Sequence, residues 1–307
     1  VRVGTMEKNQ NGNPLTAEST LVLETAQVKG SAYVNAVKMK AIELGANGNL
    51  VIANGNDLLL TGSGTSTFAD GATVTGDTST SIGLADGNLN IVNLDTLSGF
   101  KGDFRVNTGA SVNFSVADDQ DYTWSHDVLR YTDENARAVG AGEFVKSGTG
   151  TLVIGSKTNE TMPNLSGMNL VVAEGKTELN NATLLGLTTR AGTAVEVDGI
   201  FTTVNLTADK DSVFKLDVET GKTVAVKEGE TAAKKPVWGL GERGDGIRVT
   251  GTASGTLNLA VTPAHLDRGA EESIQLVDAN RAGEGFTVNL VDATGAKLEA
   301  LTAGAYD

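Results

Sequence analysis

Apolar and polar residues alternate with a period of two at several places along the chain. The alternation is strict in residues 112–116, 194–198 and 214–218. Alternate side chains of an extended strand point to opposite faces, so this pattern predicts strands with one buried face. No helical period of about 3.6 residues is sustained. The segment from Ala36 to Leu44 could form a helical turn that ends at Gly45, but its neighbours favour a strand.

Short apolar runs lie between these segments and are separated by turn-forming pairs. The runs include Leu21–Leu23, Leu50–Ile52 and Leu58–Leu60, and the pairs include Asn47-Gly48 and Asp86-Gly87. Asn-Gly and Asp-Gly tolerate the left-handed backbone that tight corners need. The runs recur at irregular intervals of roughly 15–25 residues, as expected for stacked coils that carry variable loops. We therefore expect an all-β solenoid.

The segment Gly140–Gly155 carries the most informative pattern. It reads Gly-Ala-Gly-Glu-Phe-Val-Lys-Ser-Gly-Thr-Gly-Thr-Leu-Val-Ile-Gly. Glycine suits corners where backbones approach closely, and the two apolar runs are too short for helices. A strand–corner–strand unit cannot bury its own apolar face and needs stacked neighbours. The residue sequence of this segment resembles the recurrent passenger motif of bacterial autotransporters.

A second stretch, from Asp245 to Asp307, supports the same resemblance. It opens with alternating Ile247 and Val249, continues through three further strand patterns, and closes with Ala303-Gly-Ala-Tyr. This order is similar to the pertactin-like junction, or autochaperone region, of autotransporters. A proline and a charge run in residues 228–244 interrupt the preceding ladder. We therefore expect a β-helical passenger stem in residues 1–240 and a junction module in residues 241–307.

The resemblance implies a right-handed single-stranded parallel β-helix with a C-terminal β-sandwich-like cap. It also implies a Gram-negative surface protein exported by type V secretion, either anchored in the outer membrane or released. Its own β-barrel translocator would lie outside this chain. In this family the junction module folds first and templates the following coils. That order is physically reasonable, because a preformed cap offers a partner to the exposed edge of each coil.

Composition and charge narrow the function classes further. The 307 residues include 38 glycines and no cysteine, and only 5% are aromatic. Few large aromatics suit the thin core of a solenoid, and the lack of cysteine excludes disulfides and cysteine metal sites. The net charge of −14 argues against binding to nucleic acid or to an anionic membrane surface. No basic segment followed by an apolar stretch stands at Val1, so any export signal of a longer parent is expected outside the chain.

The segment from Asp118 to Arg137 departs from the repeating pattern and gathers aromatic and acidic residues. We interpret it as a long loop or a decorated coil edge, and therefore as a candidate binding feature. Its candidate contact residues are Asp118, Asp119, Asp121, Tyr122, Trp124, His126 and Tyr131. The alternative is that the three aromatic residues of this set only cover the junction between two coils.

Arrangements for catalysis or metal binding are poorly represented. No Gly-x-Ser-x-Gly elbow accompanies the two histidines, His126 and His265, and His265 is expected in a turn between strands. We therefore assign no catalytic residue and expect neither an enzyme nor a cofactor. Four acidic residues carry hard oxygen ligands that suit Ca²⁺ but lack the spacing of a calcium loop, so a solvated acidic loop is the better interpretation. They are Asp118, Asp119, Asp121 and Asp127.

Arg243, Gly244 and Asp245 spell the tripeptide that integrins recognise. An integrin-binding loop would present these residues at an exposed tip. However, Asp245 also opens the following strand pattern, and tripeptides recur by chance. A structural role is therefore favoured over integrin binding.

These observations favour a passenger fragment that acts in adhesion or self-association, as in autoaggregation, biofilm formation and virulence. The expected partner is a host surface protein, a glycan, or another copy of the chain on a neighbouring cell. Exposed Asn, Thr and Asp side chains would form ladders whose repeated weak contacts add avidity. One alternative is an inert stem that presents an upstream enzymatic or toxin head. A weaker one is a phage-tail β-helix, which more often forms trimers and carries acidic glycosidase pairs.

Overall fold

The fold is all-β in every part of the chain that the structure describes. The computed structural model describes residues 2–3, 21–28, 31–34, 37–53, 55–132, 138–158, 162–219, 237–265, 273–292 and 294–298. These residues form 29 β-strands and one 3-10 helix, Leu94–Leu97, with no α-helix among them. Parallel pairing dominates, and the parallel β-helix expected from the sequence is confirmed. The chain forms two compact units: unit 1 comprises residues 1–150 and 162–171, and unit 2 comprises residues 151–161 and 172–307.

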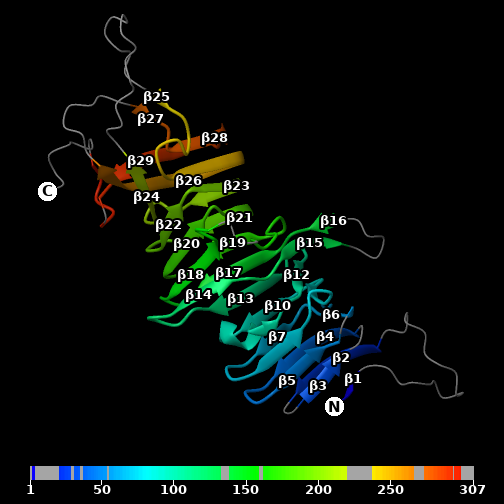
Figure 1. Cartoon of the computed structure of the whole chain (residues 1–307). Coiled ribbons are helices and arrows are strands. Elements are labelled where there is room, and N and C mark those ends of the chain that lie inside the picture. The colour runs from blue at the N-terminus through cyan, green and yellow to red at the C-terminus, as the bar shows by residue number, and fades with distance from the viewer. Residues whose placement is uncertain are drawn as a thin grey trace, which may run out of the picture. The chain divides into compact units, whose positions relative to one another are not determined.

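Each regular coil of unit 1 contains three short strands. The first such coil consists of β5 (Asn49–Ile52), β6 (Asp57–Leu60) and β7 (Thr65–Phe68). The next consists of β8 (Thr73–Gly76), β9 (Ser81–Leu84) and β10 (Asn88–Ile91). The third consists of β11 (Gly99–Phe100), β12 (Asp103–Val106) and β13 (Ser111–Ser115). Equivalent strands pair in parallel and are 24 residues apart at Asn49–Thr73 and Asp57–Ser81 (Figure 1).

Further strands extend these ladders in both directions. At the N-terminal side they are β1 (Arg2–Val3), β2 (Leu21–Val28), β3 (Ser31–Val34) and β4 (Val37–Leu44). The preference for a strand at residues 36–44 is therefore confirmed. On the other side follow β14 (Asp121–Trp124), β15 (Val128–Thr132), β16 (Ala138–Gly140) and β17 (Glu143–Ser147). Strand β15 continues the ladder of β12, and β17 continues the ladder of β13.

The predicted alternation decides which side chains fill the core of unit 1. Leu58, Ile82 and Phe104 stand in register on successive coils, and all three are fully buried. Burying an aliphatic or aromatic side chain of this size contributes about 1.5–3 kcal/mol. Each coil thus presents a row of apolar side chains that only the next coil can cover, which explains why the fold propagates by stacking.

The Gly140–Gly155 segment folds as strand, corner and strand, as predicted. Strand β17 ends at Ser147, and β18 (Thr151–Gly155) follows the corner. Gly148 has a φ of 74°, and a Cβ at Gly150 would overlap the carbonyl oxygen of Ala117. Both glycines are therefore needed at this corner. The buried Lys146 ammonium donates hydrogen bonds to the carbonyl oxygens of Gly148 and Gly150, at 2.6 Å each, and so ties the corner back to its strand.

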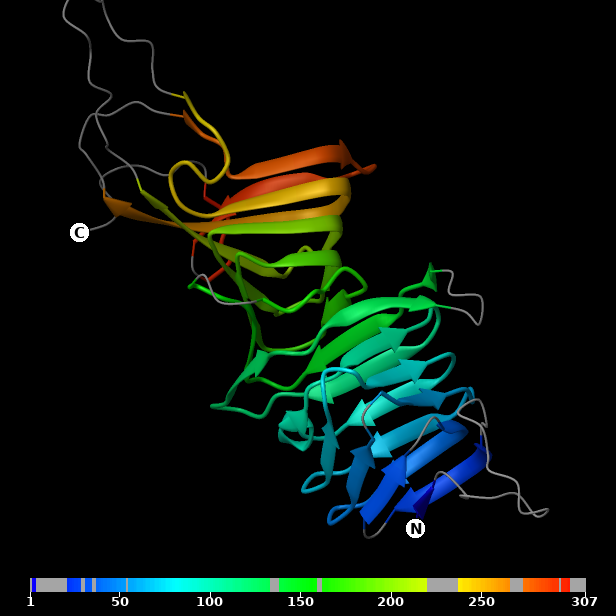
Figure 2. The same ribbon diagram turned by 45° about the vertical axis from the view of Figure 1, so that its right-hand side comes forward.

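Unit 2 is built from shorter coils with two main strands each. After β19 (Asn169–Val172), at the division between the units, come β20 (Lys176–Asn180), β21 (Thr183–Thr189), β22 (Ala194–Asp198), β23 (Ile200–Ala208) and β24 (Val213–Glu219). One parallel ladder contains β18, β20, β22 and β24, and a second contains β21 and β23. Figure 2 shows these layers of unit 2, coloured from green to yellow-green.

The described part of the predicted junction module continues both ladders. It contains β25 (Val237–Trp238), β26 (Gly246–His265), β27 (Ser273–Ile274), β28 (Val277–Ala282) and β29 (Thr287–Val291). The first part of β26 pairs with β23 and β28, and its second part pairs with β24 and β29, always in parallel. The described part of the expected cap therefore consists of parallel strands that extend the two ladders of unit 2. His265 closes β26, so the expectation of a turn there is wrong.

The predicted boundary between stem and junction module, at residues 240 and 241, stays a prediction. Residues 220–236, just before it, lie outside the described residues, as do residues 266–272 and 299–307. The closing Ala-Gly-Ala-Tyr of the resemblance falls in the last of these gaps.

Candidate interaction surfaces

The candidate binding segment, Asp118 to Arg137, is not one long loop. It contains strands β14 and β15, and β15 pairs in parallel with β12. The interpretation as a long loop is therefore wrong for residues 118–132. Residues 133–137 lie outside the described part of the chain. The segment is a coil of unit 1 whose residues divide between the core and the surface.

Trp124 and His126 belong to the core and are not available for binding. Their exposed fractions are 1% and 2%, and the Trp124 Nε1–H donates a hydrogen bond of 2.7 Å to the His126 carbonyl oxygen. The indole packs against Phe104, Phe114 and Phe144, with ring centroids 5.5–5.7 Å apart. Aromatic pairs at these separations add to the stabilisation from burial. The alternative interpretation, that the aromatic residues fill a coil junction, is the one that fits Trp124.

His126 occupies an apolar aromatic environment that disfavours its charged form. Phe100, Phe104 and Trp124 surround the ring with centroids 5.4–5.8 Å away. Neither ring nitrogen has a hydrogen-bond partner in the structure. Burial lowers the pKa of His126 to about 4, and the neighbouring Asp127 carboxylate only partly opposes this shift. The imidazole is therefore neutral at pH 7 and is not placed as a general base.

The remaining candidate residues lie at the surface of this coil. Asp118, Asp119 and Asp121 are exposed, and Asp118 accepts a hydrogen bond of 3.0 Å from Thr149 Oγ1. Tyr122 and Tyr131 are partly buried, and burial raises the pKa of Tyr122 to about 12. Among the described residues, no group of three or more His, Asp or Glu side chains is placed to hold a metal ion.

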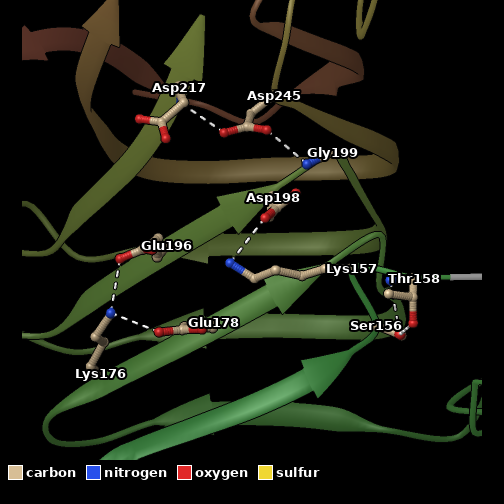
Figure 3. Close-up of polar contacts among 10 residues, drawn as sticks. All are labelled: Ser156, Lys157, Thr158, Lys176, Glu178, Glu196, Asp198, Gly199, Asp217 and Asp245. Atoms are coloured by element: carbon tan, nitrogen blue, oxygen red, sulfur yellow. Dashed lines mark hydrogen bonds and ion pairs between the residues drawn. The ribbon is translucent and has the colours of Figure 1, made fainter. Parts of the chain in front are cut away.

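Both side chains of the integrin motif, Arg243 and Asp245, are buried. The exposed fractions of Arg243 and Asp245 are 3% and 9%, and the Arg243 guanidinium lies 3.9 Å above the Trp238 ring. The Asp245 carboxylate accepts hydrogen bonds of 2.7 Å from the backbone N–H groups of Gly199 and Asp217 (Figure 3). Integrin recognition needs an exposed tip, so presentation of this tripeptide as a binding motif is excluded in this fold. The structural role favoured for Asp245 is confirmed.

A hydrogen-bonded row of polar side chains runs along the outer face of unit 1. We call Asn88, Asn90, Ser111 and Asn113 the asparagine ladder. In the register of β10 and β13, Asn88 stands opposite Ser111 and Asn90 opposite Asn113. Ser111 Oγ donates to Asn88 Oδ1 at 2.8 Å, and Asn113 Nδ2 donates to Asn90 Oδ1 at 3.0 Å. The neighbouring strand β7 adds Thr65 and Thr67 in the same register.

The asparagine ladder is ordered yet keeps bonding capacity toward solvent. Asn88 is exposed and the other three side chains are partly exposed. An amide offers two donors and an acceptor oxygen, so the bonds between coils use only part of what each asparagine can form. The bonds between coils already fix the side chains in place. A partner that binds them therefore causes a smaller loss of side-chain conformational entropy.

Unit 2 carries a different surface, which combines acidic and basic side chains. We call Lys157, Lys176, Glu178, Glu196, Asp198, Lys215 and Asp217 the charged face. Strands β20, β22 and β24 position most of them, because Thr177, Val195 and Phe214 take the inward positions between them. All seven side chains are partly or fully exposed.

Ion pairs cross between the coils of the charged face. The Lys176 ammonium lies 2.8 Å from Glu178 on its own strand and 2.9 Å from Glu196 on the next, and Lys157 lies 3.0 Å from Asp198 (Figure 3). Partial burial of Lys176 disfavours its charge, but its bonds to Glu178 and Glu196 outweigh burial and raise its pKa. Exposed pairs of this kind each contribute about 0–1 kcal/mol. They order the surface more than they stabilise the fold.

Sequence reasoning expected polar ladders but named none of these residues. The signal was present in the polar positions of the alternating strands, as in Asn88-Leu-Asn90 and Lys176-Thr-Glu178. Without the register of one coil on the next, the sequence could not show which polar residues become neighbours. Unusual composition instead indicated the segment from Asp118 to Arg137, in which Trp124 belongs to the core and Tyr122 and Tyr131 are partly buried.

A scan against protein-family models gave no match, and no curated protein matches the chain. In the part of the chain that the structure describes, no helix has the length and apolar character needed to cross a membrane.

Proposed function

We propose that this chain is part of an autotransporter passenger that is displayed on the bacterial surface and holds neighbouring cells together by binding further copies of itself. The proposal draws on the parallel β-helix and on the resemblance of residues 140–155 and 245–307 to passenger sequences. The single observation that carries it is the asparagine ladder, an ordered outward row of groups that both donate and accept hydrogen bonds.

Repetition gives such a ladder its value as an adhesive surface. Parallel strands lie about 4.8 Å apart, so two copies of the chain present polar groups at the same spacing. An asparagine amide can donate to another amide and accept from it, so identical ladders are complementary. One neutral hydrogen bond contributes only about 0.5–1.5 kcal/mol, but many molecules on two facing cells engage together and multiply the effect.

Folding of the passenger is proposed to begin at the junction module. Strand β26 supports this, because its 20 residues pair with coils on both sides and take part in both ladders of unit 2. A strand that is already ordered offers its edge to the chain that comes next, which removes the slow step of bringing distant segments together.

Clumping of bacteria that display the full parent tests the proposal. A variant with Asn88, Asn90, Ser111 and Asn113 all replaced by alanine keeps the core of unit 1 but removes the ladder. We expect its cells to lose most of their clumping at equal surface display. The matched control is Asn49→Ala with Thr73→Ala, which removes a hydrogen-bonded polar pair from another sheet of unit 1 and should leave clumping intact.

Other outcomes would redirect the proposal. If wild-type cells clump and the ladder variant clumps equally well, the asparagine ladder is not the contact surface. If wild-type cells neither clump nor bind host cells, self-association fails, and the chain is better explained as a stem that presents another domain. Binding to host cells without clumping would point to a host protein or glycan as the partner.

A further inference from the structure

The charged face of unit 2 places opposite charges symmetrically about one strand. In the parallel register, Glu178 on β20 stands opposite Glu196 on β22, and Glu196 stands opposite Lys215 on β24. An acidic side chain and a basic side chain therefore lie at equivalent positions on either side of the central strand. They are about 10 Å apart, twice the spacing of neighbouring strands.

This pattern is complementary to itself in one orientation. When a second copy is turned over by a two-fold axis that runs along β22, its β20 faces β24 of the first copy. Glu178 of each copy then faces Lys215 of the other, so the attractive pair occurs twice, as in every isologous interface. Packed sheets lie about 10 Å apart, a distance that a glutamate and a lysine extending from the two surfaces can bridge.

Lysines partly balance the row of acidic side chains that meets its own copy at the axis. Glu196 and Asp198 would face the same residues of the second copy, which would be repulsive if they were bare carboxylates. Lys176 lies 2.9 Å from Glu196, and Lys157 lies 3.0 Å from Asp198. Asp198 therefore has a lysine of its own, whereas Lys176 is shared between Glu196 and Glu178. One negative charge of this trio is left for Lys215 of the second copy to offset.

We propose that the charged face is the docking surface for a second, antiparallel copy of this chain, with Glu178 of each copy paired to Lys215 of the other. This inference rests on the proposed function and specifies how two copies are oriented. The charge pattern of β20, β22 and β24 selects the antiparallel arrangement. Charged pairs across an interface fix orientation and exclude wrong arrangements more than they raise affinity.

Charge-reversal variants displayed on cells of two colours test the proposal. In Lys215→Glu cells or in Glu178→Lys cells, both cross-copy pairs become repulsive. We expect the association of each variant with itself to weaken by at least about tenfold, because an exposed pair is lost twice and replaced by repulsion. Mixing the two variants restores both pairs, so mixed-colour clumps should form. The double variant should also clump with itself.

Control measurements separate this mechanism from damage to the fold. Lys210→Glu makes the same charge change at an exposed lysine outside the charged face and should leave clumping unchanged. Salt of about 1 M shortens the range of electrostatic interactions to about 3 Å and should weaken the mixed-variant clumps. A folding defect in either variant would persist on mixing, so only cross-copy pairing predicts the rescue.

The outcomes also separate this inference from the proposed function. If wild-type cells clump but both variants clump equally well, or if mixing restores nothing, the antiparallel docking is wrong while self-association stands. If wild-type cells do not clump at all, the proposed function itself fails. Rescue by mixing and by the double variant, with no effect of Lys210→Glu, supports the docking surface.

Discussion

The Asp245 carboxylate accepts a hydrogen bond of 2.7 Å from the backbone N–H of Asp217, a residue 28 positions earlier in the chain. Its other oxygen accepts from the N–H of Gly199, 46 positions earlier. One side chain at the start of β26 therefore satisfies backbone donors at the ends of two preceding coils of unit 2. The tripeptide that suggested a binding motif is a connection within the fold.

Replacement of Asp245 by asparagine should destabilise unit 2. Asparagine has one acceptor oxygen, so its amide would face a backbone N–H that has lost its partner. A lost charged hydrogen bond together with a buried unsatisfied donor costs about 2–3 kcal/mol. Urea unfolding should show this loss, and hydrogen exchange should show faster exchange at the amides of Gly199 and Asp217. Asp217→Asn is the matched control, because its backbone makes the bond; if both variants behave alike, this assignment of Asp245 is wrong.

His126 should make unit 1 sensitive to acid. Burial lowers its pKa from 6.5 to about 4, so between these values the unfolded chain binds a proton that the folded chain does not. The free energy of unfolding should therefore fall as the pH drops from 6.5 to 4, by about 3 kcal/mol in total. The ordinary pKa of a carboxylate lies below most of this window, which separates the histidine effect from general acid unfolding.

Replacing His126 with phenylalanine should remove most of that pH dependence. Phenylalanine fills a similar volume among Phe100, Phe104 and Trp124 and has no ring nitrogen to leave unpaired. The free energy of unfolding, measured by urea at pH 7 and pH 5, should differ less in this variant than in wild type. An unchanged pH dependence in His126→Phe would show that other groups cause it.

Removal of the Trp124 indole should leave a cavity in the core. Truncation of a buried tryptophan to alanine costs about 3–5 kcal/mol, and Trp124→Phe should cost less. Thr123→Ala, at the exposed position beside it on β14, should change stability by no more than about 0.5 kcal/mol. Thermal unfolding of the three variants checks this order. A Trp124→Ala protein as stable as Thr123→Ala would contradict the packing assigned to the indole.

Gly150 should tolerate no side chain. A Cβ there would overlap the Ala117 carbonyl oxygen, which is backbone and cannot rotate away. We expect Gly150→Ala to destabilise unit 1 by about 1–3 kcal/mol, as overpacked cores do. A Cβ at Gly64 would meet nothing within 4 Å, so Gly64→Ala serves as the control and should be nearly neutral. Equal unfolding midpoints in the two variants would refute the steric role of Gly150.

The sequence predicts the fold well because period-two alternation and glycine corners are local signals. Residues 112–116 alternate between core and surface, and the corner at Gly148 and Gly150 turns as expected. The interpretation as a long loop was wrong for residues 118–132, because unusual composition also marks a core that needs large aromatic residues. The same-strand neighbours of Trp124 gave no sign of Phe114 and Phe144, which come from other coils.

The sequence predicts that polar ladders form on the surface, but it does not predict which residues pair in them. The polar positions of β10 and β13 indicate a ladder, but the pairing of Asn90 with Asn113 depends on a coil length that varies along the chain. The regular coils of unit 1 take about 24 residues, whereas Lys176 pairs with Ala194, only 18 residues later, in unit 2. A change of one residue in a coil would bring different side chains together.

The most direct test of self-association is a two-colour mixture of cells that display the full parent and cells that do not. If the chain binds further copies of itself, clumps should contain the displaying cells and exclude the others. Equal incorporation of both colours would show that the chain binds a common surface component, and no clumping at confirmed surface display would contradict self-association.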